Sequence, residues 1–278
     1  MSVPSFAAIA PGRLAVVTGA AGGIGMAAAR AFADAGMRVV LVDRPGTALQ
    51  DAAVSIDGAT ALPTDVADRA AMTDLARTVA ERHGPVSVLM NNAGVGNNPG
   101  KPWEGLAAWK GLIDINFWGV VHGVCAFTER MLASGEPSFI INTGSKQGIT
   151  TPPGNLAYNV SKSALKTYTE GLAHALRNMP GSQVSAHLLI PGFTYTGMTE
   201  GATDKPAGAW SGDEVVSFML ESLSRGDFYI LCQDNETTRD MDQRRMAWAM
   251  GDIIENRPAL SRWHPDYKDA FAATMKEE

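Results

Sequence analysis

The sequence predicts an α/β protein in which one mostly parallel sheet carries helices on both faces. Two observations support this fold class. Seven short apolar runs alternate with longer amphipathic stretches, and that alternation is typical of strands joined by right-handed helical crossovers. The chain, with 278 residues, is also short enough for one α/β domain built around one core. We therefore expect a single doubly wound domain over residues 1–278.

The apolar runs define the predicted strands and the amphipathic stretches the predicted helices. The strands are Leu14–Thr18, Arg38–Asp43, Ala59–Leu62, Val86–Asn91, Ser138–Thr143, Gln183–Ile190 and Asp227–Leu231. The helices are Gly23–Ala35, Ala67–His83, Leu106–Ala133, Leu156–Arg177 and Asp213–Ser224, with a polar candidate at Glu236–Ile254. Parallel strands covered on both faces read as near-continuous apolar runs, as these do. Ligands of such sheets bind beyond the carboxyl ends of the strands, so the residues there are the first candidates for function.

Composition excludes several classes of function. The chain holds 23 basic and 29 acidic side chains and has a sequence pI near 5.4, which gives little attraction for phosphate backbones or anionic lipids. We expect neither nucleic acid nor a membrane as a partner. The two cysteines, Cys125 and Cys232, cannot form a disulfide framework, so a reducing cytosol is the simplest compartment. The uncharged stretch Leu14–Ala29 contains four glycines, which disfavours a signal segment or a bilayer span.

A glycine loop follows the first predicted strand. It reads Thr-Gly-Ala-Ala-Gly-Gly-Ile-Gly from Thr18 to Gly25 and opens the next helix. Glycines let a backbone approach a pyrophosphate, and the helix N-terminus offers free N–H groups. Asp43 ends the second strand, where a carboxylate can accept hydrogen bonds from the adenosine ribose and repels a 2′-phosphate. Arg44 could tolerate that phosphate, but the loop has no basic residue to assist it, so NAD is favoured over NADP.

Three side chains are candidates for proton transfer. Ser145 follows the fifth predicted strand, whereas Tyr158 and Lys162 are spaced i and i+4 and share one helical face. A nearby ammonium favours a phenolate, so we expect Lys162 to lower the pKa of Tyr158. The Ser145 hydroxyl can stabilise an oxygen on which charge develops. Asn116 lies mid-helix, where asparagine is a poor helix former, and either satisfies a kink or holds a water.

These residues together resemble the short-chain dehydrogenase/reductase family, over about Arg13 to Leu231. The motifs are the Thr-Gly-x-x-x-Gly-x-Gly loop, Asp65, Asn91-Asn92-Ala93-Gly94, Asn116, Ser145, Tyr158, Lys162 and Pro191-Gly192. The resemblance implies a Rossmann-type seven-stranded sheet. Within it, residues 13–192 would form the dinucleotide-binding and catalytic core, residues 193–226 a substrate loop and helix, and residues 227–278 the last strand and a C-terminal extension.

The resemblance also assigns roles. It implies that Tyr158 is the general acid/base, that Lys162 holds the nicotinamide ribose, that Ser145 orients the substrate oxygen and that Asn116 supports a proton relay. The implied cofactor contacts are Gly19, Gly23, Ile24, Gly25, Asp43, Arg44, Asp65, Val66, Asn92, Ala93, Gly94, Tyr158, Lys162, Pro191, Gly192, Thr194 and Thr196. Thr194 stands where valine is usual in this family.

The substrate side is less defined by sequence. The residues expected there are Lys146, Gln147, Asn155, Tyr195 and Met198, with Trp210 in the same loops. Each aromatic or methionine side chain could equally be a core or subunit contact. In the tail, Met241 and Trp248 share one helical face, so the tail either closes over the pocket or packs on a second subunit.

The sequence therefore predicts an NAD(H)-dependent oxidoreductase that interconverts a secondary alcohol and a ketone on a partly apolar small molecule. We expect no metal and, by resemblance, a homodimer or homotetramer. An NADP(H)-dependent carbonyl reductase is one alternative. A non-catalytic, cofactor-sensing binding protein on the same scaffold is another, although such a protein would have no chemical need for Ser145, Tyr158 and Lys162 together.

Overall fold

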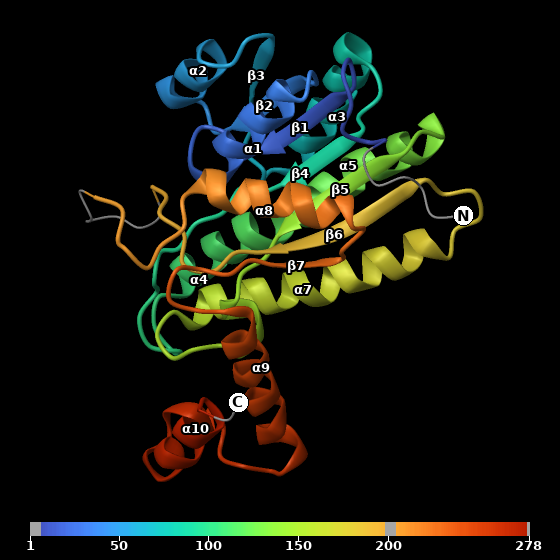
Figure 1. The fold of residues 1–278 in the computed structure, drawn as a ribbon. Helices are drawn as coiled ribbons and strands as arrows, with labels where there is room; N and C mark the ends of the chain where they lie inside the picture. Colours follow the sequence, from blue (N-terminus) through green and yellow to red (C-terminus); the bar gives the residue numbers. More distant parts are fainter. Residues whose placement is uncertain (1–6, 198–203, 277–278) are drawn as a thin grey trace.

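The computed structural model describes residues 7–197 and 204–276. Within these ranges the strands form one seven-stranded parallel sheet in the order β3-β2-β1-β4-β5-β6-β7 (Figure 1). The strands are β1 Leu14–Thr18, β2 Arg38–Asp43, β3 Ala59–Pro63, β4 Val88–Asn91, β5 Ser138–Thr143, β6 Val184–Ile190 and β7 Tyr229–Leu231. The predicted doubly wound fold class is confirmed.

The strand order reverses direction next to β1. The chain moves outward from β1 to β2 and β3, then returns to pair β4 with the other side of β1. Loops that follow β1 and β4 therefore leave the sheet in opposite directions and open a crevice between them. The glycine loop lies on one side of this crevice and Asn92–Gly94 on the other.

The helices cover both faces of the sheet. They are α1 Gly23–Asp34, α2 Thr47–Val54, α3 Arg69–His83, α4 Leu106–Ile113, α5 Gly119–Ser134, α6 Gln147–Thr150, α7 Leu156–Arg177, α8 Gly212–Ser224, α9 Arg239–Ile254 and α10 Lys268–Thr274, with three short turns η1 Asp114–Trp118, η2 Ser261–Trp263 and η3 Pro265–Tyr267. One core cluster joins α1, α2 and α8 to the sheet through Ala28, Leu49 and Val216. A second joins α3, α5 and α7 to the opposite face.

Small side chains let α1 approach the sheet closely. Ala28, Ala29 and Phe32 of this helix are fully buried in the first cluster. Every residue of β1 is buried as well, which matches the uninterrupted apolar run read from the sequence. The glycine loop therefore connects two elements whose spacing is set by the core.

Several local features differ from the sequence expectations, and the short helices α6 and α10 are among those not predicted. Helix α2 was not predicted, because its eight residues form a short surface segment in which only Leu49 and Ala52 are buried. The single helix expected over Leu106–Ala133 contains a π-helical turn, η1, between α4 and α5. A π-turn arises from one extra residue per turn, which residue periodicity does not reveal, and such turns are frequent at functional sites.

This interrupted helix is long and apolar enough to cross a membrane by length and composition alone. Its residues Val120, Val124, Phe127 and Met131 are buried in the second core cluster. That packing is typical of a central helix in a folded domain.

The C-terminal extension forms a small helical module that projects from the body of the molecule, with α10 at its far end (Figure 1). Met246 of α9 packs against a third apolar cluster made by Leu188, Ile190 and Leu231. Farther along α9, the Trp248 indole donates to Ser261 Oγ at 2.8 Å, and the Arg257 guanidinium lies 4.1 Å from the Trp248 ring centroid. The extension is therefore a folded unit that contacts the rest of the domain through α9.

The approach of α5 to β4 depends on Gly123. A methyl group there would overlap the side-chain oxygen of Asn91 and lie 3.1 Å from its Cγ. We predict that Gly123→Ala lowers the free energy of unfolding by about 1–3 kcal/mol because helix and strand must separate. Urea denaturation measures this change.

Gly171 on α7 is the matched control. It is also a helical glycine, but a Cβ there meets nothing within 4 Å. Gly171→Ala should raise the free energy of unfolding by about 0.5–1 kcal/mol through helix propensity alone. Equal effects at the two positions would contradict the packing argument.

Candidate active site

The carboxyl ends of β1, β4 and β5 are joined by polar side chains. Asn92, directly after β4, donates its amide to the carbonyl of Thr18 at 3.2 Å and accepts the Thr143 hydroxyl at 3.2 Å. The Thr18 hydroxyl accepts the backbone N–H of Asn92 at 2.9 Å. Asn92 thus bridges the ends of three neighbouring strands.

The glycine loop is shaped by close backbone contacts. Gly19 has φ +66°, and a Cβ on it would lie 2.8 Å from Cα of Ala93. A Cβ on Gly25 would lie 2.7 Å from the Asn92 amide nitrogen. Helix α1 then starts at Gly23 behind Gly22, which provides no side-chain cap. The N-cap of α1 therefore offers no side-chain acceptor to the first N–H groups of the helix, and a helix N-terminus of this kind suits an anion.

Asp43 lies beside this loop. One carboxylate oxygen accepts the backbone N–H of Ala21 at 3.0 Å, and the other accepts the N–H of Arg44 at 2.8 Å. The Arg44 side chain is exposed. The acidic group expected to read the adenosine ribose is therefore attached to the loop expected to hold the pyrophosphate.

Four further residues implied as cofactor contacts differ in their surroundings. Asp65 is exposed and closes its own turn by accepting the N–H of Ala67 at 2.9 Å. Val66 is buried, and its side chain packs where α5 begins, at Gly119. Ile24 and Ala93 are partly buried against the two core clusters.

Asn116 is held in the π-turn η1 and is fully buried. Its side-chain oxygen accepts the Val95 N–H at 2.8 Å, while its amide donates to the Val95 carbonyl at 2.9 Å and to Ser161 Oγ at 3.2 Å. A Cβ on Gly94 would lie 3.3 Å from that oxygen and 3.8 Å from Lys162 Nζ. The structure therefore brings Gly94, Asn116 and Lys162 together.

Helix α7 supplies Tyr158 and Lys162 to this site. Lys162 is 4% exposed, its Nζ donates to the Thr143 carbonyl at 2.7 Å, and it lies 5.6 Å from the Tyr158 ring centroid. Tyr158 is hydrogen-bonded to Ser145. Ser145 Oγ also accepts the N–H of Gln147 at 3.1 Å, which fixes the Ser145 side chain within its own turn.

Burial is the main cause of the pKa shifts of both Lys162 and Tyr158. It lowers the pKa of Lys162 to about 8, so the ammonium still exists at neutral pH. It raises the pKa of Tyr158, and the hydrogen bond with Ser145 opposes that rise only in part. The pKa of Tyr158 is therefore shifted upward, whereas the sequence analysis expected a downward shift. Removal from water penalises the phenolate more than its neighbours stabilise it.

The loop after β6 lies close to the same site. Pro191 is buried and accepts the Lys146 N–H at 3.2 Å. The Thr194 hydroxyl donates to the Gly192 carbonyl at 3.2 Å. Thr196 approaches the glycine loop, since a Cβ on Gly23 would lie 3.1 Å from its Cγ2. This segment, whose residues are among the implied cofactor contacts, thus borders the glycine loop.

The predicted substrate-side residues have different surroundings. Gln147 is exposed. Asn155 caps α7 by accepting the Tyr158 N–H at 3.1 Å and donates to the Gly96 carbonyl at 2.9 Å, so both ends of its amide are engaged within the protein. Tyr195 pairs through its backbone N–H with the Trp210 carbonyl at 2.8 Å. Met198 lies outside the described residues.

Lys146 points away from open solvent toward two carboxylates. Its Nζ lies 3.3 Å from Asp234 Oδ2 and 2.7 Å from Asp242 Oδ2. Neither aspartate was singled out in the sequence, where each sits in a polar stretch beyond the recognised motifs. Only the folding of α9 against α6 and β6 places them beside the residue that follows Ser145.

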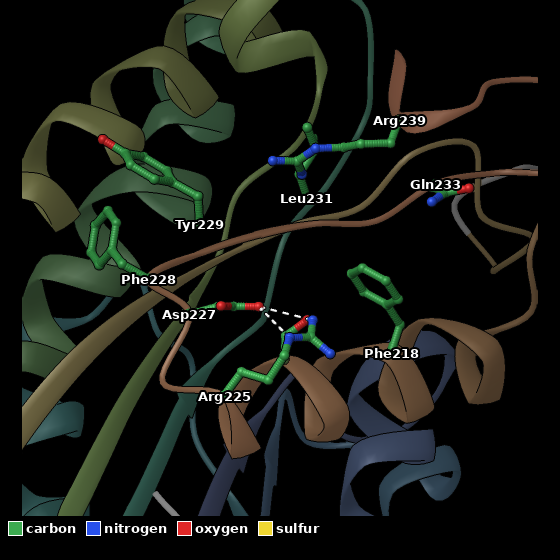
Figure 2. A pocket seen from close by; sticks show the side chains of 9 residues that line it. Phe218, Arg225, Asp227, Phe228, Tyr229, Leu231, Gln233 and Arg239 are labelled. Atoms are coloured by element: carbon green, nitrogen blue, oxygen red, sulfur yellow. Dashed lines mark hydrogen bonds and ion pairs between the residues drawn. The ribbon is translucent and has the colours of Figure 1, made fainter. Parts of the chain in front are cut away.

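A separate cavity of about 460 Å³ lies along the outer edge of β7. Figure 2 shows it between α8 and β7, with Arg225 directed to Asp227 and the rings of Phe228 and Tyr229 together. None of the described residues that line it belongs to the predicted catalytic or cofactor set. The reactive residues meet elsewhere, at the carboxyl ends of the central strands.

Comparison with known proteins gives the same family. The chain matches the model for short chain dehydrogenases over residues 13–207. A 1-deoxy-11-beta-hydroxypentalenate dehydrogenase of Streptomyces arenae is 35% identical over 277 residues, covering 95% of this chain and 98% of the relative.

Two solved structures extend the comparison. A short-chain dehydrogenase/reductase of Burkholderia phymatum in complex with NAD has a TM-score of 0.81 and 30% identity, covering 90% of this chain and 96% of that chain. A metagenomic short-chain oxidoreductase in complex with NADP has a TM-score of 0.66 and 29% identity, covering 81% and 98%. Both cofactors thus occur among structural relatives. The chain belongs to the short-chain dehydrogenase/reductase family and is an oxidoreductase that acts on hydroxyl or ketone groups.

Proposed function

We propose that this enzyme interconverts a secondary alcohol and a ketone with NAD(H), and that Tyr158 is its general acid/base. The observation that supports this most strongly is the meeting of four side chains at one point. Ser145 is hydrogen-bonded to Tyr158, Lys162 lies 5.6 Å from that ring, and Asn116 and Lys162 both border Gly94.

The residues present fit a dinucleotide. Gly19 and Gly25 leave no room for a side chain between the loop and Asn92–Ala93, and the uncapped start of α1 suits a pyrophosphate. Asp43 would bind the adenosine ribose hydroxyls and disfavour a 2′-phosphate, which supports NAD over NADP. Lys162 would hold the nicotinamide ribose. The bound nicotinamide supplies the chemistry of hydride acceptance or donation at the substrate carbon.

The chain's own residues would manage the proton. The Ser145 hydroxyl donates to the substrate oxygen as negative charge develops on it, which stabilises the transition state more than the ground state. Tyr158 gives its phenolic proton to that oxygen in ketone reduction and accepts it in alcohol oxidation. Lys162, charged at neutral pH, stabilises the phenolate form. Asn116 holds Val95 and the π-turn in place beside them.

The surroundings support a partly apolar small-molecule substrate. Phe193, in the loop after β6, is 47% exposed, and Leu156, near Tyr158 on α7, is 39% exposed. The Streptomyces arenae relative is named for a dehydrogenase reaction on a hydroxylated pentalenate, so we propose hydroxylated carbocyclic compounds as the first class to test. We further propose a cytosolic homodimer or homotetramer.

The proposed function is tested by following NADH absorbance with a panel of cyclic, aliphatic and aryl secondary alcohols and the matching ketones. Turnover with at least one secondary alcohol and NAD is expected. Binding of NADH without turnover of any panel member would instead favour the non-catalytic binding protein.

Replacing Tyr158 by phenylalanine should lower kcat at least about a thousandfold, since the proton donor is lost. The dissociation constant for NADH, measured by fluorescence titration, should stay within about threefold. Tyr168→Phe is the matched control because Tyr168 lies on the same helix in the second core cluster. Retained turnover in Tyr158→Phe would remove this residue from the mechanism.

Replacing Asp43 by asparagine should reduce the preference for NAD over NADP by about tenfold, because the charge that repels the 2′-phosphate is gone. The measurement is the ratio of kcat/KM values for the two cofactors. Asp57→Asn, an exposed carboxylate in the turn before β3, should leave the ratio unchanged. An unchanged ratio in Asp43→Asn would show that another group selects the cofactor.

Because burial raises the pKa of Tyr158, the phenol form dominates at neutral pH. Oxidation needs the phenolate, so its kcat/KM should rise about tenfold per unit between about pH 6 and pH 8. Ketone reduction needs the phenol and should stay level over that range. If kcat/KM for oxidation did not change over this pH range while hydride transfer limited the rate, Tyr158 would not be the base.

A further inference from the structure

Lys146 occupies a buried charge cluster directly beside the reactive serine. Its side chain is 16% exposed, and those of its partners Asp234 and Asp242 are 8% and 7% exposed. The Lys146 ammonium lies 3.3 Å from Asp234 Oδ2 and 2.7 Å from Asp242 Oδ2. One buried cation thus contacts two carboxylates, and an ammonium used in this way is not free to recognise a substrate anion.

Asp234 connects Lys146 to the loop after β6. The Asp234 Oδ2 atom that faces Lys146 also accepts the N–H of Phe193 at 3.4 Å. A Cβ on Gly192 would lie 2.7 Å from this same oxygen and 3.0 Å from Lys146 Nζ. The Lys146–Asp234 ion pair therefore packs directly against Gly192, in the segment that would border the nicotinamide.

Asp242 connects Lys146 to the C-terminal extension. It lies in the first turn of α9 and is buried. Two arginines belong to the same part of the extension. Arg245 of α9 donates to Thr237 Oγ1 at 3.2 Å, and Arg262, in η2, is close enough for Asp242 and Arg245 to influence its pKa. Asp242 is thus the link between the catalytic side of the molecule and the tail.

The position of Ser145 depends on the turn that these charges hold. On one side of the turn, Gly148 packs on the backbone of Lys162, with a built Cβ 2.6 Å from the Lys162 carbonyl carbon. On the other side, the Lys146 N–H bonds to the Pro191 carbonyl at 3.2 Å. The Lys146 side chain adds the only charged contact described for this turn, and it reaches both the Gly192 loop and α9.

We propose that Lys146 is a positioning residue. Held between Asp234 and Asp242, it clamps the Ser145 turn against the Gly192–Phe193 loop and makes the geometry of the reacting groups depend on the C-terminal extension. We refer to Lys146, Asp234 and Asp242 as the clamp. The inference rests on the proposed function for its kinetic test but not for its structural test.

The first experiment removes one carboxylate. Asp242→Asn leaves the Lys146–Asp234 pair and its charge balance intact, so the variant should fold and bind NADH with a dissociation constant within about threefold of wild type. Its kcat should fall about tenfold, since small displacements of catalytic groups are costly. Asp240→Asn is the matched control, because Asp240 pairs with Arg244 on the exposed side of the same helix and its side chain is 64% exposed.

The second experiment varies the cation. Lys146→Met removes the charge at similar length and should lower kcat at least as much as Asp242→Asn, whereas Lys146→Arg keeps the charge and should retain kcat within about threefold. Because Lys146→Met leaves two buried carboxylates unpaired and can fail to fold, Asp242→Asn decides the question in that event. A kcat within threefold of wild type in folded Asp242→Asn, an equal loss in Asp240→Asn, or no difference between arginine and methionine at position 146 overturns the proposal.

A third measurement does not need turnover. Hydrogen exchange read by mass spectrometry over residues 143–150 should be at least about tenfold faster in Asp242→Asn than in wild type, and unchanged in Asp240→Asn. If wild type turned over no alcohol or ketone, the proposed function would fail while this measurement still tested the clamp. Unchanged exchange in Asp242→Asn overturns the clamp even if the wild-type enzyme is active.

Discussion

Three parallel strands end side by side at the point where the sheet reverses its order, and Asn92 connects them. Its amide reaches the carbonyl of Thr18 at the end of β1, and its oxygen accepts the hydroxyl of Thr143 at the end of β5. Parallel strands present unpaired backbone groups where they separate, and buried groups of this kind require partners. The Asn92 amide donates to two such carbonyls, those of Thr18 and Gly19. The glycine loop and the Ser145 turn start from these strand ends, and Lys162 donates to the Thr143 carbonyl, so their relative positions depend on this connection.

The reactive group is built from desolvated side chains whose charge is controlled by burial. Lys162 keeps its ammonium at neutral pH even though burial lowers its pKa to about 8. Its Nζ donates to a backbone carbonyl rather than to a carboxylate, so the positive charge is not cancelled by a neighbouring anion. Tyr158 responds to the same environment by holding its proton more tightly. In the protein by itself, the pair is therefore poised as a proton donor, with the cation placed to stabilise the phenolate once the proton has left.

The two halves of the site are built by different means. The proposed dinucleotide side would consist of backbone N–H groups, glycines and one carboxylate, and its shape follows from the packing of α1 and β1 in the core. The substrate side is assembled from loops after β5 and β6 that lean on the C-terminal extension through Lys146 and Asp242. A change in the extension can therefore alter the reacting geometry without touching the cofactor cradle, which gives related chains a physical route to different substrates.

The linear sequence determined the fold class and the place of the glycine loop and Asp43 in it, and it was sufficient to single out Ser145, Tyr158 and Lys162 as the proposed catalytic residues. These features depend on local properties: runs of apolar residues, glycines before a helix, and residues spaced i and i+4 that share a helical face. The order of elements also follows from the alternation of strands and helices.

Tertiary structure alone decided the rest. The π-turn at Asn116, the use of Asn155 as a helix cap, the direction of the Tyr158 pKa and the pairing of Lys146 with Asp234 and Asp242 were not accessible from sequence. Each depends on which groups meet across long separations in the chain and on how much water they lose when they do. Burial and charge pairing belong to the folded arrangement, whereas periodicity and backbone freedom are already present in the order of the residues.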